Sequence, residues 1–357
     1  MRLDPGLTVL QIAEDTVQIG SGTRSIQLSG CTPEALGYLD HLVRGIPDGQ
    51  EAEAARRCGM DPAQARGLEA SLADVLRRHE PPGSAGAGHA SDVLADDLAL
   101  ALALDTGPAT AAGAVEARAT DAGERTAHVI ASRQGLHVQV LGLGRTGAAL
   151  ARVLAASGVG RLALWDHREV TVADLGTGYL AADLGRHRAI ALSHRLDDAG
   201  LDTVILPLTS PDRPRPGGTL TVSVTRGAAD DDYIALARAA DHPVLPVVMR
   251  DDDAVIGPWL MPGLGGCPLC WDLAARQSDP LRARRAAALG GQRAGREDVG
   301  LATAAGALAA RQAVRWAETG TVGAGTALHV HGDGSRVDTL VVAAHPDCGC
   351  GPAGAAA

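Results

Sequence analysis

The sequence predicts an α/β protein in which a small α+β module precedes a larger domain with a mixed, mostly parallel sheet between helices. Two patterns indicate this. From residue 127 to residue 357, short apolar runs alternate with amphipathic segments, which is typical of a parallel sheet covered by helices. In residues 1–80, three short alternating runs come before three short helical segments. Residues 81–126 open with a proline- and glycine-rich stretch and are therefore predicted to be a linker with a connecting helix.

The composition is that of an ordinary globular protein and excludes several functional classes. The 357 residues are 46% hydrophobic and 21% charged, which suits about two domains with buried cores. The net charge of −10 argues against a nucleic-acid surface and against binding to anionic membranes. All 32 cationic side chains are arginines, which excludes Schiff-base lysines and a P-loop lysine. With no readable signal peptide or membrane span, we expect a cytoplasmic protein.

The N-terminal module has the size and element order of a winged helix. Three short strands are expected at Leu7–Ile12, Thr16–Ile19 and Ser25–Leu28. Three helices follow, beginning at Pro33, Glu51 and Pro62. Thr32 and Asp61 are residue types that cap a helix, and each is followed by a proline at the first helical position. The third helix, expected to run from Asp61 to His79, carries nearly balanced charge, so DNA binding is not favoured.

Two roles remain open for this module. It is either a structural or dimerising appendage, or a groove that holds an extended peptide as an added strand. In the second hypothesis the peptide pairs with Ser25, Ile26, Gln27 and Leu28 and packs against the third helix. The leucines of that helix suit a core equally well, so individual contact residues on it are not assigned.

The segment from His137 to Val170 carries the nucleotide-binding fingerprint of a Rossmann-like domain. An apolar strand leads into Gly142, Gly144 and Gly147; a helix and a second strand follow, and Asp166 ends that strand, 24 residues after the first glycine. Such glycines let the backbone approach phosphate at a helix N-terminus, and the terminal carboxylate can accept ribose hydroxyls. The alternative is a fold that has kept its tight turn and lost its nucleotide.

Four of the six cysteines form two pairs late in the chain. Cys267 and Cys270 stand in CPLC, Cys348 and Cys350 in CGC, and a glycine lies beside each pair. Four thiolates in two turns suit tetrahedral Zn²⁺ in a structural site, with no open coordination position. Free buried thiols and a disulfide are the alternatives, but a bridge within CGC would be strained and a reducing compartment opposes a long-range one. His345 is expected to pack or hydrogen-bond instead of ligating.

From about Val138 to the C-terminus, the chain resembles the ThiF and MoeB adenylyltransferases and the ubiquitin-activating enzymes. The resemblance rests on the glycine loop, on the helix and strand that end in AASGVGRLALWD, and on HREVTVADLGTGYLAADLGRHRA after them. It implies that the glycine loop and Asp166 hold ATP. It also implies that an arginine, a lysine and a magnesium-binding aspartate serve the phosphates during adenylation of a carboxylate.

Three of these family positions differ in this sequence. The family arginine falls on Thr177 and the family lysine on Arg188. The magnesium-binding aspartate follows the fourth strand, and it falls on Ser210 if that strand is Thr203–Leu206. Because phosphoryl chemistry depends on positive charge and metal around the transferring group, the glycine loop, Asp166 and Arg188 are expected to form a vestigial site. ATP binding is expected to be weak or absent, and the protein is not expected to be an enzyme on its own.

The cysteine pairs and the N-terminal module together resemble the ocin-ThiF, or cyclodehydratase partner, family of azole-forming ribosomal peptide biosynthesis. GPWLMPGLGGCPLCWDLAARQSDP and the terminal HPDCGC carry this resemblance. It implies binding of a precursor's leader peptide by the winged-helix module, and delivery of the core peptide to a YcaO-type cyclodehydratase that consumes the ATP. It also implies a homodimer. The stretch Asp105–Gly123 matches nothing in that family.

Two rival functions remain. An active adenylyltransferase would act on the C-terminus of a peptide or carrier protein, but Thr177 and Ser210 argue against it. A nicotinamide-dependent oxidoreductase shares the glycine fingerprint and Asp166. No histidine or tyrosine acid in a recognisable setting follows, and a closed zinc site does not help that chemistry.

Overall fold

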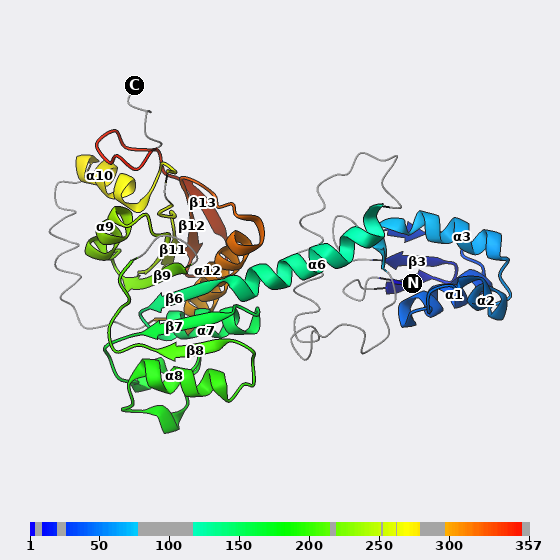
Figure 1. The fold of residues 1–357 in the computed structure, drawn as a ribbon, viewed down its shortest axis with the longest axis horizontal. Coiled ribbons are helices and arrows are strands. Elements are labelled where there is room, and N and C mark those ends of the chain that lie inside the picture. The colour runs from blue at the N-terminus through cyan, green and yellow to red at the C-terminus, as the bar shows by residue number, and fades with distance from the viewer. Residues whose placement is uncertain are drawn as a thin grey trace. The chain divides into compact units, whose positions relative to one another are not determined.

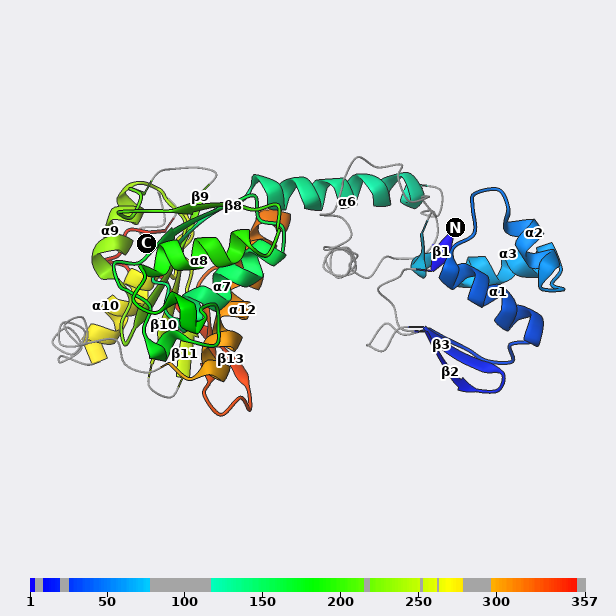
Figure 2. The ribbon, with the colours of Figure 1, turned by 90° about the horizontal axis from the view of Figure 1, so that it is seen from below.

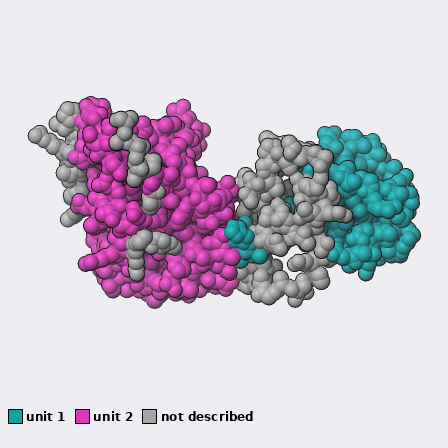
Figure 3. Space-filling model, turned by 45° about the horizontal axis from the view of Figure 1, so that its top comes forward, with its two compact units in different colours: residues 1–130 teal, residues 131–357 magenta. Residues whose placement is uncertain are grey.

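The computed structural model describes residues 1–3, 9–19, 26–77, 117–214, 219–250, 253–261, 263–278 and 297–351. The chain divides into two compact units, residues 1–130 and 131–357, shown in Figure 3. Most of the predicted linker and connecting helix lies outside the described residues, and α6 (Ala117–Gly135) begins after it. Within the described ranges, no helix is long and apolar enough to cross a membrane.

Unit 1 joins a three-stranded antiparallel meander to three short helices, in the order predicted from the sequence (Figure 1). The strands are β2 (Val9–Ala13), β3 (Thr16–Ile19) and β4 (Ile26–Leu28). The helices are α1 (Pro33–Arg44), α2 (Glu51–Arg57) and α3 (Pro62–Ser71). Strand β3 lies in the middle, so β4 is an edge of this sheet. Side chains of β3 and α1, such as Ile19 and Leu42, share one core.

Helix α1 shows how the local sequence sets an element's ends. The hydroxyl of Thr32 accepts a hydrogen bond from the amide of Ala35 at 3.3 Å, and Pro33 occupies the first helical position. The helix ends at Gly45, whose φ of 94° suits glycine because no Cβ clashes there. The predicted cap at Thr32 and the proline at the first helical position are both confirmed. At α3, however, Asp61 makes no side-chain capping bond.

The third helix ends earlier than predicted. Helix α3 stops at Ser71, a single 3₁₀ turn η1 (Ala73–Val75) follows, and β5 (Leu76–Arg77) pairs antiparallel with β1 (Arg2–Leu3). The helix predicted from Asp61 to His79 is therefore too long, because apolar residues keep helical spacing across the turn; His79 itself lies outside the described residues. Leu72, just after α3, is fully buried. Its helical spacing from the earlier leucines therefore reflects packing in the core and not a continued helix.

Unit 2 is built on an eight-stranded mixed sheet with the order β13-β12-β11-β10-β9-β6-β7-β8. The parallel strands are β6 (His137–Leu141), β7 (Arg161–Trp165), β8 (Val204–Pro207), β9 (Thr219–Arg226) and β10 (Val244–Met249). The antiparallel strands are β11 (Asp253–Ile256), β12 (Thr326–His331) and β13 (Val337–Val341). The chain runs outward from β6 to β8, then returns to β9 on the other side of β6. This reversal creates a switch point at the carboxyl end of β6, where ligands bind in such sheets.

Figures 1 and 2 show the helices of unit 2 around its sheet. Their apolar side chains belong to two hydrophobic clusters. The larger cluster packs α7 (Arg145–Ala156), α8 (Arg188–Asp197) and α12 (Val299–Thr319) against the sheet. The smaller one joins α9 (Asp231–Ala239) and α10 (Pro268–Ser278) to the cysteine cluster. Helices α7 and α12 approach closely, since a Cβ on Gly306 would lie 2.9 Å from the amide nitrogen of Leu150. The strand pairs of unit 2 confirm the predicted mixed, mostly parallel sheet.

Candidate functional site

The glycine loop between β6 and α7 is required by backbone packing. Gly142 has a φ of 85°, and a Cβ there would lie 2.2 Å from the carbonyl oxygen of Val224. A Cβ on Gly147 would lie 1.9 Å from the carbonyl oxygen of Gly142. Both contacts are far closer than atoms tolerate, so the first and third glycines hold the strand-to-helix turn together whether or not a nucleotide binds.

The N-terminus of α7 already holds a carboxylate from the chain itself. Glu297, just before α12, accepts hydrogen bonds through Oε2 from the amide of Thr146 at 2.9 Å and from its hydroxyl at 2.7 Å. Its carbonyl oxygen accepts from Arg145 at 2.8 Å. A Cβ on Gly144 would lie 3.0 Å from Glu297 Oε1, so the glycine that leaves room for phosphate here leaves room for Glu297. A helix N-terminus attracts anions, and this one is satisfied internally.

Asp166, predicted to accept ribose hydroxyls, is bound by protein groups on several sides. Its carboxylate accepts from the amide of Leu143 at 2.8 Å, the amide of Arg168 at 2.9 Å and the guanidinium of Arg188 at 2.9 Å. Burial by itself would raise the pKa of Asp166, but Arg188, the Leu143 amide and Arg168 together lower it. The carboxylate is therefore ionised and engaged inside the protein.

Arg188, which replaces the family lysine, lies buried between two carboxylates. One terminal nitrogen contacts Asp166, and the other is 2.7 Å from Asp174 Oδ1. Asp174 in turn accepts from the amide of Thr171 at 2.8 Å and from its hydroxyl at 2.9 Å. The guanidinium thus joins the end of β7 to the 3₁₀ turn η2 (Val172–Asp174). Arg188 is held as a structural cation, away from the role of a free phosphate ligand.

A cleft of about 440 Å³ opens beside these groups. Its lining is mostly polar and charged: Gly144, Arg145, His167, Arg168, Glu169, Thr171, Ala173, Asp174, His187, Arg188 and Glu297. Thr177 and Ser210 do not line it. Thr177 is buried, and its hydroxyl has no hydrogen-bond partner.

The position predicted for the magnesium-binding aspartate needs correction. The strand predicted at Thr203–Leu206 is β8, the third parallel strand in chain order, and it pairs with β7 at the edge of the sheet. The fourth parallel strand is β9, which pairs with β6 beside the glycine loop. The last residue of β9 is Arg226. An arginine, and not Ser210, therefore stands near the position of the family's magnesium-binding aspartate. A cationic side chain cannot ligate Mg²⁺.

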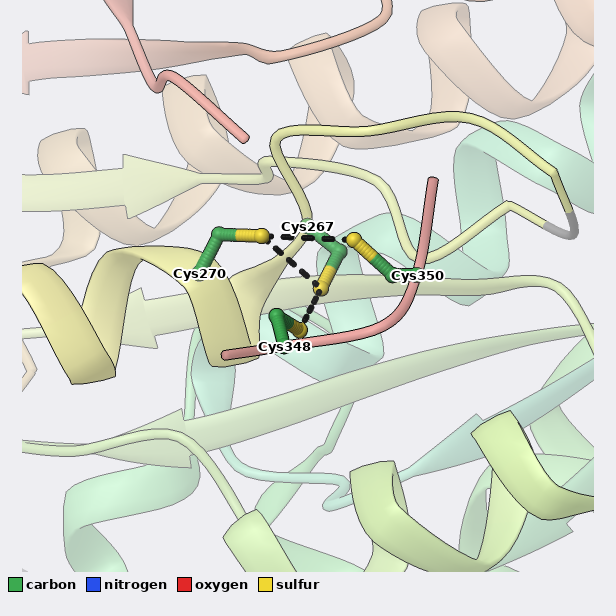
Figure 4. Close-up of side chains that lie close together, drawn as sticks. All are labelled: Cys267, Cys270, Cys348 and Cys350. Atoms are coloured by element: carbon green, nitrogen blue, oxygen red, sulfur yellow. Dashed lines mark hydrogen bonds between the residues drawn. The ribbon is translucent and has the colours of Figure 1, made fainter. Parts of the chain in front are cut away.

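The four cysteines meet as predicted (Figure 4). Sγ of Cys267 lies 3.8 Å from that of Cys270 and 3.5 Å from that of Cys348, and Cys270 lies 3.2 Å from Cys350. All four are buried, and their sulfurs lie within 4.8 Å of one another. Sulfurs about 2.3 Å from a tetrahedral ion would be about 3.8 Å apart. The cluster therefore fits one metal ion with four thiolate ligands.

The surroundings of Cys270 favour its thiolate. Burial opposes ionisation, but the amide of His345, 3.2 Å from Sγ, and the neighbouring thiols lower the pKa of Cys270 to about 7. Burial raises the pKa of Cys348 to about 11. The ring of His345 pairs with Gln277 at 2.9 Å and is not part of the cluster, which agrees with its predicted role.

The predicted peptide-binding strand is only partly described. Ser25 lies outside the described residues. Ile26 and Leu28 are half-buried, Gln27 is exposed, and all three belong to β4 at the edge of its sheet. An edge strand has unpaired amide and carbonyl groups, which an added strand can use.

With this geometry in place, comparisons with known proteins assign the glycine loop to a family. Residues 126–211 match the ThiF family. In this segment the chain is similar to ThiF proteins. The resemblance inferred from the glycine loop onward is confirmed there. No curated protein matches the sequence.

Solved structures share the fold of the ThiF domain and its neighbouring elements. Microcin C7 biosynthetic enzyme MccB in complex with N-formylated MccA matches with a TM-score of 0.67 at 13% identity, over 98% of each chain. MccB of E. coli with AMPCPP and MccA matches with a TM-score of 0.65 at 13% identity, over 98% of this chain and 99% of that one. PaaA matches with a TM-score of 0.65 at 15% identity, over 95% and 99%. At such identities the likeness concerns the fold.

Sequence reasoning missed Glu297 and Asp174, which line the cleft, and Arg226, which ends β9. Glu297 lies about 150 residues after the helix whose N-terminus it binds, so no local pattern could place it there. Asp174 was not among the residues predicted for the site. For the pair of Asp174 and Arg188, the sequence offered only an aspartate 14 positions before an arginine.

Replacing Arg188 with methionine leaves the buried carboxylates of Asp166 and Asp174 without their shared cation. We expect the free energy of unfolding at pH 7 to fall by about 3–5 kcal/mol. The lowered pKa of Asp166 means that its contribution is present above the usual carboxyl range near 3.8 and is lost as the pH falls below it. Urea unfolding should therefore show the difference between variant and wild type narrowing toward pH 3.

Arg168→Met is the matched control, because Arg168 contacts the same carboxylate with its side chain 41% exposed. Its loss should cost less than about 1 kcal/mol. Equal losses in the two variants would contradict a special role for the buried guanidinium.

The double variant Cys348→Ser/Cys350→Ser removes half of the cysteine cluster. We expect the metal content, measured by plasma mass spectrometry, to fall from about one ion per chain to near zero, with a lower melting temperature. Cys58→Ser, a cysteine of unit 1 outside the cluster, should keep the metal. A metal-free wild-type protein purified without chelator would be evidence against the site.

Proposed function

We propose that this protein binds the leader of a ribosomally made precursor peptide and presents the core to a YcaO-type cyclodehydratase, without itself activating a carboxylate with ATP. The observation that carries the proposal is the internally filled nucleotide site of the ThiF domain. Glu297 takes the anion position at α7, and Arg188 takes the carboxylate of Asp166. The fold is intact, but the groups that could bind phosphate are already paired with carboxylates of the chain.

The missing catalytic groups support the same conclusion. Phosphoryl transfer needs cations and a metal clamp around the transferring phosphate. Here Thr177 stands at the position of the family arginine, and Arg226 ends the strand that should lead to the magnesium ligand. Both changes act on the transition state, so the site has little means to accelerate adenylation.

Unit 1 is the proposed site for the leader peptide. Among the described strands, β4 lies at an edge of its sheet and carries half-buried apolar side chains, which suits strand addition by an extended peptide. Likeness to MccB adds support, because MccB has been solved with MccA and with N-formylated MccA. The winged-helix character of unit 1 is part of this proposal.

We assign Zn²⁺ to the cysteine cluster. Four thiolates in a closed, buried, nearly tetrahedral set favour Zn²⁺ in a structural role, with no position left for substrate. The ion would tie the N-terminal end of α10 to the end of the described chain. Reduced thiols are needed for this, so the proposal includes a reducing cytoplasmic location.

A homodimer or a docked cyclodehydratase needs an exposed apolar surface on unit 2. Val172, Leu180 and Ile190 are 72%, 58% and 43% exposed, and they lie on or beside η2, the turn η3 (Ala181–Asp183) and α8. Exposed large apolar side chains are common at interaction surfaces. We propose that this surface serves the protein partners.

The second candidate is an active adenylyltransferase. It is favoured by the open cleft and by the likeness to MccB of E. coli solved with ATP. It would require Glu297 to leave α7. The internal pairing of Asp166 argues equally against a nicotinamide cofactor.

Calorimetric titration of the zinc-loaded, full-length protein with magnesium-ATP, and separately with NAD, tests the closed nucleotide site. We expect no saturable heat with either ligand. The variant Glu297→Ala frees the N-terminus of α7, and ATP binding seen only in this variant would identify Glu297 as the group in the way. Wild-type binding of ATP with pyrophosphate exchange would overturn the proposal.

Hydrogen–deuterium exchange tests peptide binding at β4. The probes are synthetic leader segments of short precursor-like open reading frames encoded beside this protein. We expect the amides of Ile26–Leu28 to exchange more slowly with a bound leader, because an added strand pairs with them. Strand β13, at one edge of the eight-stranded sheet, is the control, and its exchange should not change. Binding that protects neither edge would contradict strand addition.

A further inference from the structure

A second group of metal-ligating side chains lies in unit 2, on strands β11, β12 and β13. His329 and His331 alternate along β12, so both point to the same face of the sheet. The antiparallel register places Asp338 of β13 directly opposite His329, and Asp253 of β11 directly opposite His331. Three neighbouring strands therefore bring two imidazoles and two carboxylates to one patch.

The distances within this patch are short. Nε2 of His331 lies 2.8 Å from Oδ2 of Asp338, and the two imidazole rings are 4.3 Å apart between centroids. Ligand atoms from His329, His331 and Asp338 all lie within 4.8 Å of one another. The three side chains are between 20% and 41% exposed, so an ion has access from solvent.

We propose that His329, His331 and Asp338 form a second metal site, which takes a divalent transition ion such as Ni²⁺, Cu²⁺ or Zn²⁺. Two imidazoles and a carboxylate are the ligand types that these ions prefer. Three protein ligands leave a coordination position open, in contrast to the closed set of four cysteines.

Asp253 has the position of a supporting carboxylate. Its Oδ2 lies 2.8 Å from Nε2 of His329, which fixes that ring and leaves Nδ1 as the nitrogen for an ion. Metal-binding histidines regularly donate their other ring nitrogen to a carboxylate in this way. Asp253 is itself held by Arg250, at 2.7 Å from Oδ2. The imidazole is therefore oriented before any ion arrives.

A cation already stands at the proposed ion position. Nε of Arg336 lies 3.1 Å from Nε2 of His331 and 3.1 Å from Oδ2 of Asp338, between the two atoms that would share the ion. The side chain of Arg336 is 64% exposed and can swing into solvent when an ion displaces it.

The test is a Ni²⁺ titration of tag-free, full-length protein whose cysteine cluster is already loaded with zinc. We expect one additional ion per chain and a rise in melting temperature with Ni²⁺. His331→Gln and Asp338→Asn should each weaken Ni²⁺ binding by at least about tenfold. Arg336→Gln should strengthen it, because the competing cation is gone. A purely structural hydrogen-bond network would not give this gain.

His128→Gln is the matched control, since His128 is an exposed histidine outside the cluster. It should leave Ni²⁺ affinity unchanged. Thermal unfolding without Ni²⁺ checks that each variant folds, and Asp338→Asn replaces His331→Gln if the latter does not. Absence of saturable Ni²⁺ binding to the wild type, or wild-type affinity in both ligand variants, would overturn the proposal.

Discussion

A buried guanidinium between two carboxylates organises the region where a nucleotide would sit. Arg188 begins α8, Asp166 directly follows β7 and Asp174 ends η2, so three segments meet at one charged group. Removing such charges from water is costly, and only close pairing and further hydrogen bonds offset the cost. The amides of Leu143 and Arg168 supply those bonds to Asp166. The glycine loop, the acidic strand end and the following turn are therefore fixed relative to one another with no ligand present.

The same principle operates at the neighbouring helix. The N-terminus of α7 has unsatisfied amides and a partial positive charge, and Glu297 supplies the anion. Without this carboxylate, these groups would be exposed in the cleft. Glu297 supplies the anion for the amide of Thr146, and Arg188 supplies the cation for Asp166. The charged groups around the glycine loop are therefore paired within the chain itself.

Much of the fold could be predicted because the relevant constraints are local. Gly147 is imposed by its close approach to the carbonyl oxygen of Gly142, five residues before it, and the glycines of this turn leave a recognisable spacing in the sequence. The metal site could also be predicted from the cysteine pairs, since the two sulfurs of each pair are brought together by a short turn. Predictions failed where distant segments decide. Strand β5 forms by pairing with the distant β1. Ser210 was misplaced because the strand before it, β8, is the third parallel strand, and the fourth, β9, lies beside β6. Glu297 comes from another part of the chain.

The cysteine cluster also has a topological consequence. It joins Cys270 to Cys350 and Cys267 to Cys348, and the chain between the two pairs contains Glu297, α12, β12 and β13. An ion bound there closes a loop of 77 residues between Cys270 and Cys348. In the comparable case of a disulfide, a loop of this size restricts the unfolded chain by about 4.5 kcal/mol. The metal would therefore act at a distance, as a crosslink that limits how far the segment bearing Glu297 can stray from α7.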